Sequence, residues 1–256
     1  MISISHPFLL DRNGQTENSG LAFVFRGSDS PLPTEIDQFL HPQEQSLYSN
    51  ALVSKRQNDF LGGRYAAKKA LAEVIPHLVP NQILISSGVF GQPCLEIPHD
   101  SLLEVSIAHS DALSAAMVGP RRHPLGIDIE VINPDKQKTL ASQVTEEELL
   151  LFENFEMTDI ERLTRIWATK EALSKALRTG MTCPFEILSI RSAEPDPSSP
   201  LITGRFHNFS QYTFHSWAVE TFAFSLALPF RTTLKFDTAP HTMINQLLAE
   251  RDGSSK

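Results

Sequence analysis

The sequence predicts an α+β fold built from two similar halves. Each half reads as helical segments accompanied by short β-rich runs, without the strict strand–helix alternation of a parallel, doubly wound sheet. A turn-rich stretch over residues 119–125 divides the 256 residues almost equally. We therefore expect a first domain over residues 1–120 and a second over residues 121–256, although no residue-level repeat relates the two.

The first half is expected to hold a long helical region and several strands. Residues 1–20 are polar and turn-rich and predict irregular structure, whereas residues 21–26 have the composition of a strand. Residues 35–75 are mostly helical by their apolar periodicity, and Pro76 prevents continuation. Short β-rich runs between turn residues predict further strands over residues 83–86, 94–97, 103–108 and 112–118.

The second half begins with a predicted strand over residues 126–130. The spacing of a capping box predicts a helix over residues 145–155. A second helix is expected over residues 158–178, with Gly180 placed as a C′ glycine. Antiparallel strands are predicted over residues 186–190, 216–219 and 221–228.

Composition argues against several classes of protein. The formal net charge of −8 and the pI of about 5.6 argue against general nucleic-acid binding. No apolar run approaches the roughly 20 residues of a membrane span, and residues 1–20 lack the features of a signal peptide. Cys94 and Cys183 are expected to be free thiols in a reducing compartment. We therefore expect a cytoplasmic protein that binds neither nucleic acid nor membranes.

Asp128 and Glu130 occupy alternate positions of the predicted strand over residues 126–130, so their side chains lie on one face. Two like charges on one face repel each other unless a cation screens them. Carboxylate oxygens are the ligands that a hard divalent cation prefers. The pair therefore predicts a metal site, and the alternative is polar decoration of a solvent-facing strand.

Glu171 and Lys175 lie one turn apart on the predicted helix over residues 158–178, with Trp167 one turn before Glu171. One interpretation is a surface ion pair beside an apolar stripe that includes Trp167. The other is a third carboxylate for Mg²⁺, with a lysine that neutralises charge on a leaving phosphate. Together with Asp128 and Glu130, the second interpretation indicates phosphoryl-group chemistry.

Basic residues also collect in the first half of this acidic chain. Arg56 and Arg64 lie on the predicted helical region, where they form either a solvated helix face or an anion site. His109 and Ser110 follow a predicted strand and offer hydrogen-bond donors suited to a phosphate. The sequence contains no P-loop, no G-x-G-x-x-G motif and no nucleophile elbow, which argues against the common nucleotide-binding and hydrolase families.

Three ordered motifs resemble those of the 4′-phosphopantetheinyl transferases. They are Ser-Ile-Ala-His-Ser at residues 106–110, Gly-Ile-Asp-Ile-Glu at residues 126–130 and Trp-Ala-Thr-Lys-Glu-Ala-Leu-Ser-Lys at residues 167–175. Their order and the spacing of the last two are similar to those of the family. The length resembles its larger single-chain (Sfp-like) branch, which implies two similar α/β halves arranged as a pseudo-dimer.

The resemblance implies an enzyme that transfers the 4′-phosphopantetheine group of coenzyme A to a serine of an apo acyl or peptidyl carrier protein, with Mg²⁺ as cofactor and adenosine 3′,5′-bisphosphate as product. It implies that Glu171, either directly or through a metal-bound water, accepts the serine proton and that Lys175 stabilises the breaking phosphoanhydride. The implied metal ligands are Asp128, Glu130 and Glu171. The implied coenzyme A contacts are Arg56, Arg64, His109, Ser110, Asp128 and Lys175.

Two segments depart from the family pattern. Residues 91–93 read Gly-Gln-Pro where the family often has a basic residue in the middle, and Val144 stands where the family has an aromatic residue before the capping box. The same acids would also serve a Mg²⁺-dependent pyrophosphohydrolase, and a protein that binds coenzyme A or a carrier without catalysis is a further alternative. We expect the second half to face the carrier, and we expect a monomer, because a pseudo-dimer completes its own site.

Overall fold

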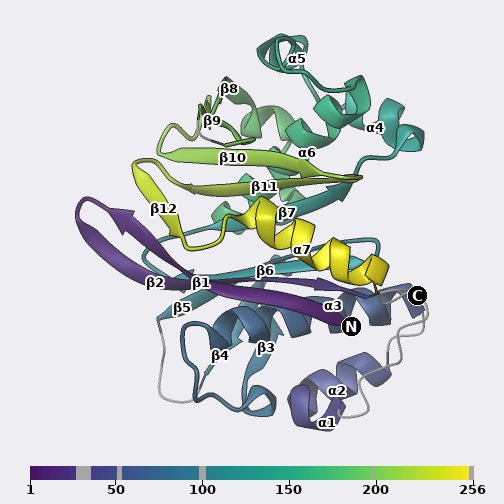
Figure 1. Cartoon of the computed structure of the whole chain (residues 1–256), viewed down its shortest axis with the longest axis vertical. Helices are drawn as coiled ribbons and strands as arrows, with labels where there is room; N and C mark the ends of the chain where they lie inside the picture. Colours follow the sequence, from purple (N-terminus) through teal and green to yellow (C-terminus); the bar gives the residue numbers. More distant parts are fainter. Residues whose placement is uncertain (27–35, 51–53, 98–101, 198, 254–256) are drawn as a thin grey trace. The chain divides into compact units, whose positions relative to one another are not determined.

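The computed structural model describes residues 1–26, 36–50, 54–97, 102–197 and 199–253 (Figure 1). The chain divides into two compact units: unit 1 contains Met1–Arg122 and Thr233–Lys256, and unit 2 contains His123–Thr232. This differs from the division predicted at residue 120 mainly in the C-terminal segment, which belongs to unit 1. The reason is that β12 (Thr232–Phe236) lies beside β1 in one sheet, and α7 (Pro240–Gly253) packs on β1 and β2.

Unit 1 is built on a five-stranded sheet in the order β12-β1-β2-β6-β5. Besides β12, its strands are β1 (Ile2–Arg12), β2 (Gln15–Phe25), β5 (Leu103–Ser110) and β6 (Leu113–Pro120). The prediction of irregular structure over residues 1–20 is wrong, because β1 and β2 form a hairpin. Asn13 and Gly14 turn the hairpin with φ angles of 55° and 77°, which suits the positive φ angles of a type I′ turn.

The helical region predicted over residues 35–75 is divided in the structure, and residue 35 lies outside the described residues. It forms three helices, α1 (Ile36–Phe39), α2 (Pro42–Ser49) and α3 (Ser54–Ala72). A capping box between His41 and Glu44 begins α2, and Pro42 is accommodated at its first turn. α3 packs on β1, β2, β5 and β6, and Figure 1 shows α3 and α7 on opposite sides of β1.

A small hairpin follows α3 in unit 1. The strands predicted over residues 83–86 and 94–97 are confirmed as β3 (Leu84–Ser87) and β4 (Pro93–Glu96), which pair antiparallel. A short 3₁₀ helix, η1 (Pro80–Gln82), precedes them.

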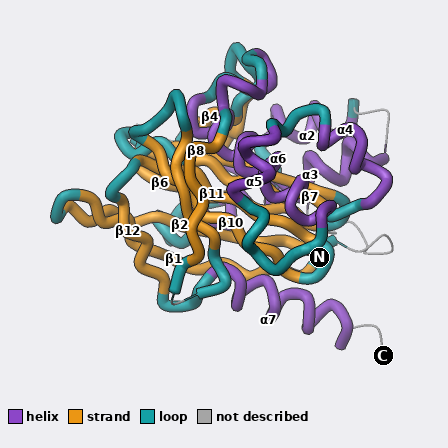
Figure 2. The backbone as a smooth tube through the Cα atoms, turned by 90° about the horizontal axis from the view of Figure 1, so that it is seen from above, coloured by secondary structure: helices purple, strands orange, loops and turns teal. Residues whose placement is uncertain are grey.

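Unit 2 contains a second five-stranded sheet, in the order β7-β11-β10-β9-β8. Its strands are β7 (Gly126–Val131), β8 (Ile190–Pro195), β9 (Ile202–Phe206), β10 (Tyr212–Val219) and β11 (Phe222–Pro229). α6 (Asp159–Leu177) packs on β7, β10 and β11. Figure 2 distinguishes these helices and strands by colour. The shorter helices are η2 (Pro134–Lys136), α4 (Gln137–Ala141), α5 (Glu146–Leu151), η3 (Gly180–Thr182) and η4 (Phe185–Leu188).

Two local predictions in unit 2 are corrected. The strand predicted over residues 186–190 is mostly the 3₁₀ helix η4, and the strand begins only at Ile190. α6 ends at Leu177, and its C-cap residue Arg178 takes the left-handed conformation with φ 60°, so Gly180 is not the C′ residue. The predicted capping box of α5 is present between Thr145 and Glu148.

The two units repeat one structural plan, and particular residues correspond between them although the sequence showed no residue-level repeat. In unit 1, Lys68 of α3 donates to the Oε2 atom of Glu44 at 2.5 Å. In unit 2, Lys170 of α6 donates to the Oε2 atom of Glu148 at 2.6 Å. Each glutamate belongs to a capping box, and its Oε1 atom accepts from the backbone N–H of a strand residue, Ile85 in unit 1 and Ile190 in unit 2. Each lysine also donates to a backbone carbonyl.

Two glycines extend this repeat to the strands. A Cβ atom on Gly20 of β2 would lie 1.9 Å from the carbonyl oxygen of Ala70, and one on Gly126 of β7 would lie 2.0 Å from that of Ala172. Both alanines lie two residues after the repeated lysine. β2 therefore corresponds to β7, and α3 corresponds to α6. Each unit combines helices with a sheet on the same plan, which confirms the prediction of an α+β fold with two similar halves.

Among the described residues, no helix has both the length and the apolar character that crossing a membrane would require.

Candidate functional site

The predicted acids Asp128 and Glu130 lie on β7, and Asp128 faces α6. Gly126 permits this close packing, because a side chain at its position would collide with the backbone of α6. Lys175 of α6 reaches the strand and donates from Nζ to the Oδ1 atom of Asp128 at 2.6 Å. Glu171, one turn earlier on α6, is close enough to raise the pKa of Asp128 through its charge. The structure therefore gathers all four residues in unit 2.

The surroundings of Asp128 in this cluster disfavour the ionised form of its carboxylate. Its side chain is buried, and burial raises its pKa to about 7 against the opposing effect of Lys175, with further upward contributions from Glu130 and Glu171. Its Oδ2 atom is buried and has no hydrogen-bond partner among the described residues. Burial also raises the pKa of Glu171, again against the effect of Lys175. Lys175 therefore does not fully compensate the burial of Asp128 and Glu171.

Glu130 is held by two donors. Trp167 of α6 donates from Nε1 to the Oε1 atom of Glu130 at 3.3 Å, and Lys136 of η2 donates from Nζ to Oε2 at 3.0 Å. The indole ring of Trp167 stacks on Phe185, with 4.4 Å between ring centroids. Sequence reasoning missed Lys136, because a single lysine in a turn after a strand carries no pattern.

The donor set fits a hard divalent cation. All three acids offer carboxylate oxygens, which Mg²⁺ prefers, and the orphaned Oδ2 atom of Asp128 is a buried acceptor ready for a cation. Within the described part of the chain, no three His, Cys, Asp or Glu side chains already converge as a metal-binding group. One oxygen of Asp128 and one oxygen of Glu130 instead accept from lysine ammonium groups.

Comparison of the two units distinguishes the residues of this cluster from the residues that maintain the fold. Unit 1 keeps the Glu44–Lys68 pair but has different residues where unit 2 has the cluster. The positions that correspond to Asp128, Glu130, Glu171 and Lys175 hold Ala22, Val24, Lys69 and Glu73. Since the same buried pair is present without the acids, Glu148 and Lys170 are part of the scaffold, although Lys170 is adjacent to Glu171.

The basic residues predicted in the first half lie in unit 1. Arg56, Arg64 and His109 line one cavity of about 420 Å³. Arg64 also has a structural role, because its Nη2 donates to the carbonyl of Ile85 at 3.1 Å and its Nε lies 3.4 Å from the Oε1 atom of Glu44. Burial lowers the pKa of Arg64, and Glu44 opposes that shift. Arg56 is exposed and has the freer side chain.

Asp59 adds an acidic group to this cavity. Its Oδ2 atom lies 3.9 Å from the Nδ1 atom of His109, and both residues line the cavity with Gly91 and Pro93. Ser110 is buried and is not among the described residues that line it. The structure therefore brings His109 but not Ser110 together with the two arginines.

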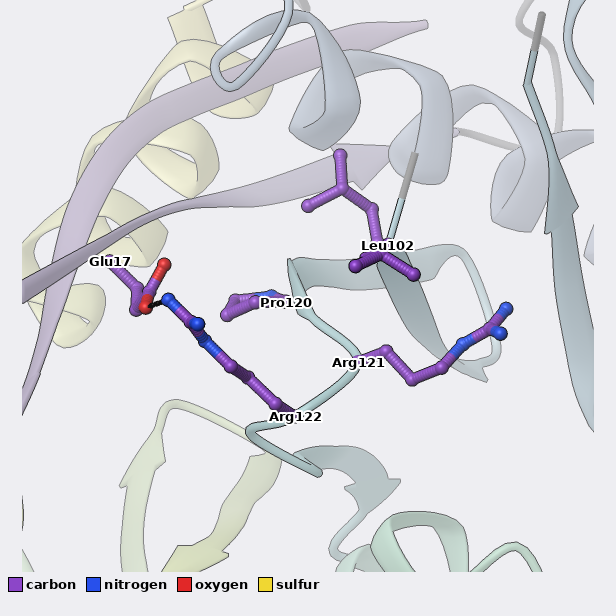
Figure 3. Close-up of a pocket in the computed structure, with 6 residues that line it drawn as sticks. Glu17, Leu102, Pro120, Arg121 and Arg122 are labelled. Carbon is purple, nitrogen blue, oxygen red and sulfur yellow. Dashed lines mark hydrogen bonds and ion pairs between the residues drawn. The ribbon is translucent and has the colours of Figure 1, made fainter. Parts of the chain in front are cut away.

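A second cavity of unit 1, of about 470 Å³, has a different character (Figure 3). Leu102, Leu103 and Pro120 give it apolar walls, and Arg122 forms an ion pair with Glu17 at its edge. It contains none of the predicted site residues.

Comparisons with known proteins agree with the motifs. The sequence model of the 4′-phosphopantetheinyl transferase superfamily matches residues 124–228. A holo-[acyl-carrier-protein] synthase from Bacillus pumilus is 36% identical over 89 residues, which cover 32% of this chain and 73% of that protein. One from Anoxybacillus flavithermus is 33% identical over 92 residues, which cover 34% of this chain and 76% of that protein.

A solved structure is also similar in part. It is a holo-(acyl-carrier-protein) synthase from Bacillus anthracis in complex with CoA (3′,5′-ADP), with 22% identity, coverage of 33% of this chain and 77% of that chain, and a TM-score of 0.31.

The family match includes the whole of β7 and α6, and hence Asp128, Glu130, Glu171 and Lys175. The Bacillus pumilus relative exceeds 30% identity over nearly three quarters of its own length. The chain therefore belongs to the 4′-phosphopantetheinyl transferase superfamily.

Proposed function

We propose that this protein transfers the 4′-phosphopantetheine group of coenzyme A to a serine of an apo acyl or peptidyl carrier protein and releases adenosine 3′,5′-bisphosphate. The observation that carries the proposal is the cluster of three carboxylates and Lys175 on β7 and α6, inside the segment that matches the family. The names of the relatives, which are holo-[acyl-carrier-protein] synthases, support the same reaction.

Asp128, Glu130 and Glu171 are proposed to hold Mg²⁺. Bound there, the cation would neutralise charge on the pyrophosphate of coenzyme A. The raised pKa of Asp128 and its unpartnered Oδ2 atom support this assignment, because an uncompensated buried carboxylate is what an added cation would stabilise.

Glu171 is the proposed base for the serine proton, and Lys175 the proposed group that stabilises the breaking phosphoanhydride. Burial raises the pKa of Glu171, and a carboxylate with a raised pKa is a better proton acceptor than an ordinary surface glutamate. Lys175 is partly exposed and is bound to Asp128 through one ammonium contact. If Asp128 bound a cation, the ammonium group of Lys175 would be available for a substrate phosphate.

The cavity of unit 1 is proposed to receive phosphate groups of coenzyme A. Arg56, Arg64 and His109 supply positive or polar donors there, and Ser110 stays a proposed contact through its position beside His109. We accordingly assign coenzyme A phosphate contacts to the first half, and the metal-binding acids and the carrier-facing surface to the second. We also propose that the protein is a cytoplasmic monomer and belongs to the larger single-chain branch of the superfamily.

The test is intact-mass spectrometry of apo acyl and peptidyl carrier proteins incubated with the protein, coenzyme A and Mg²⁺. The wild type is expected to add the mass of one phosphopantetheine to a carrier, and Asp128→Asn is expected to abolish the addition. Asp135→Asn removes an exposed carboxylate of the same unit and is expected to leave activity unchanged.

Two results would contradict the proposal. Breakdown of coenzyme A without carrier modification would indicate a pyrophosphohydrolase. Intact coenzyme A and unmodified carriers, with coenzyme A binding by calorimetry, would indicate a binding protein without catalysis.

A further inference from the structure

A buried pair of hydroxyl groups lies between α6 and β11. Thr169 and Ser225 are both fully buried, and their side-chain oxygens lie 3.1 Å apart. Thr169 donates its proton to the carbonyl of Arg165 at 2.8 Å. Its Oγ1 atom therefore acts as the acceptor in the contact with Ser225, and the Ser225 hydroxyl is the donor. Ser225 also lies 3.4 Å from the carbonyl of His215, a weaker contact.

Ser225 is the direct register partner of Asp128 in the β7–β11 pair. Side chains of residues directly opposite each other project from the same face, with Cβ atoms about 4.5–5.5 Å apart. Both side chains also reach α6, Asp128 through Lys175 and Ser225 through Thr169. The Ser225 side chain thus projects from the sheet next to that of Asp128, whose Oδ2 atom has no partner among the described residues.

The internal repeat shows that the scaffold does not require these hydroxyls. Ala22 of β2 corresponds to Asp128, and its register partner is Ala116 of β6, which corresponds to Ser225. The residue before the repeated lysine is Ala67 in unit 1 and Thr169 in unit 2. Three alanines of unit 1 are therefore replaced together by an aspartate, a serine and a threonine in unit 2.

A buried hydroxyl lowers stability unless a hydrogen bond compensates it. Unit 1 has alanine at both corresponding positions and forms the same arrangement of strands and helix. The hydroxyls of Ser225 and Thr169 are therefore associated with the buried carboxylate and are not required by the fold. Groups that hydrogen-bond to metal-binding carboxylates orient them and raise metal affinity.

We propose that Ser225 and Thr169 are positioning residues for Asp128. In this proposal, which rests on the proposed metal-binding function, the Ser225 hydroxyl rotates from Thr169 to donate to the Oδ2 atom of Asp128 when the carboxylate receives a divalent cation. Thr169 retains its bond to Arg165 and keeps Ser225 in the orientation from which this rotation is short.

The test is calorimetric titration of Mn²⁺ into the full chain, with and without coenzyme A and with no carrier protein. Ser225→Ala and Thr169→Val each remove one hydroxyl with little change in volume and are expected to weaken Mn²⁺ binding about tenfold. Thr169→Ser keeps the hydroxyl and is expected to bind like the wild type.

Thr164→Val is the matched control, because Thr164 is equally buried on α6 and donates to the carbonyl of Ile160 at 2.7 Å, four residues earlier, as Thr169 does to Arg165. It is expected to leave Mn²⁺ affinity unchanged.

Melting curves followed by tryptophan fluorescence establish that Ser225→Ala and Thr169→Val are folded. The proposal is overturned if these folded variants bind Mn²⁺ as the wild type does. Failure of the wild type itself to bind Mn²⁺ would overturn both the proposed metal site and the inference. A wild type that binds Mn²⁺ but modifies no carrier would count against the proposed reaction alone.

Discussion

Lys175 Nζ lies 2.6 Å from Asp128 Oδ1, while the other carboxylate oxygen of Asp128 is buried without a hydrogen-bond partner among the described residues. The lysine compensates only part of the cost of burial, and the pKa of Asp128 still rises to about 7. This half-compensated carboxylate is held in place by the close packing of α6 on β7, which Gly126 permits. The relationship leads to a testable dependence of stability on pH.

Replacement of Asp128 by Asn is expected to flatten the stability of metal-free protein between pH 4 and pH 7. Because the pKa of Asp128 is raised to about 7 in the folded protein, folding favours its protonated form, and stability falls as pH rises from about 4 to about 7. The contribution is of order 1 kcal/mol per pH unit. Asp128→Asn removes this loss, and the measurement is urea unfolding in a chelator at several pH values.

Tryptophan fluorescence is the suitable signal for this experiment, because Trp167 and Trp217, the two tryptophans of the chain, both lie in unit 2. Asp135→Asn, at an exposed position, is expected to follow the wild-type profile. Equal pH profiles for Asp128→Asn and wild type would contradict the burial argument.

His215 of β10 is expected to destabilise unit 2 in acid. Both of its ring nitrogens are buried without hydrogen-bond partners among the described residues, and burial lowers its pKa to about 4 although Asp196 opposes the shift. The unfolded chain then binds a proton more readily, so stability falls as pH decreases from about 6.5 to about 4. His215→Gln is expected to lose this acid sensitivity, measured by thermal melting at pH 7 and pH 5.

The matched control is His207→Gln, an exposed histidine of the same unit. It should melt like the wild type at both pH values. If His215→Gln keeps the full acid sensitivity of the wild type, another group is responsible.

Replacement of Lys170 by Met is expected to destabilise unit 2 by about 3–5 kcal/mol, because it leaves the fully buried Glu148 without its charged partner. Lys68→Met is expected to act similarly on unit 1 through Glu44. Denaturant unfolding followed by tryptophan fluorescence measures the loss of stability in the Lys170 variant. Far-UV circular dichroism, which reports on both units, measures the loss in the Lys68 variant. Glu146→Gln, an exposed acid on α5, serves as the control, and a Lys170 variant as stable as this control would refute the structural role.

The two arginines of the unit 1 cavity are expected to respond differently to substitution. Arg56 is exposed, so Arg56→Ala should weaken coenzyme A binding about tenfold and leave stability within about 0.5 kcal/mol. Arg64→Ala should in addition lose stability, because Arg64 binds the carbonyl of Ile85 and lies beside Glu44. Calorimetry with coenzyme A and circular dichroism melting separate the two effects; equal loss of stability in both variants would contradict the assignment.

Much of the fold followed from local patterns. The capping box at Thr145 and Glu148 and the apolar periodicity over residues 158–178 were sufficient to predict α5 and α6, because helix initiation depends on nearby residues. The N-terminal hairpin was missed because polar composition outweighed the Asn13-Gly14 turn signal. The strand predicted over residues 186–190 failed for a related reason, since a short apolar run does not distinguish a strand from a 3₁₀ turn.

By itself, the sequence determined the family motifs and the chemical types at the site, because Asp128 and Glu130 alternate on one strand, and Glu171 and Lys175 lie one turn apart on one helix. Only the tertiary structure decided which groups meet. Packing of α6 on β7 gave Asp128 its burial and its lysine partner. Pairing of β7 with β11 gave Asp128 its neighbour Ser225, which lies far away in sequence. Such contacts depend on sheet register and helix packing, and no local pattern encodes them.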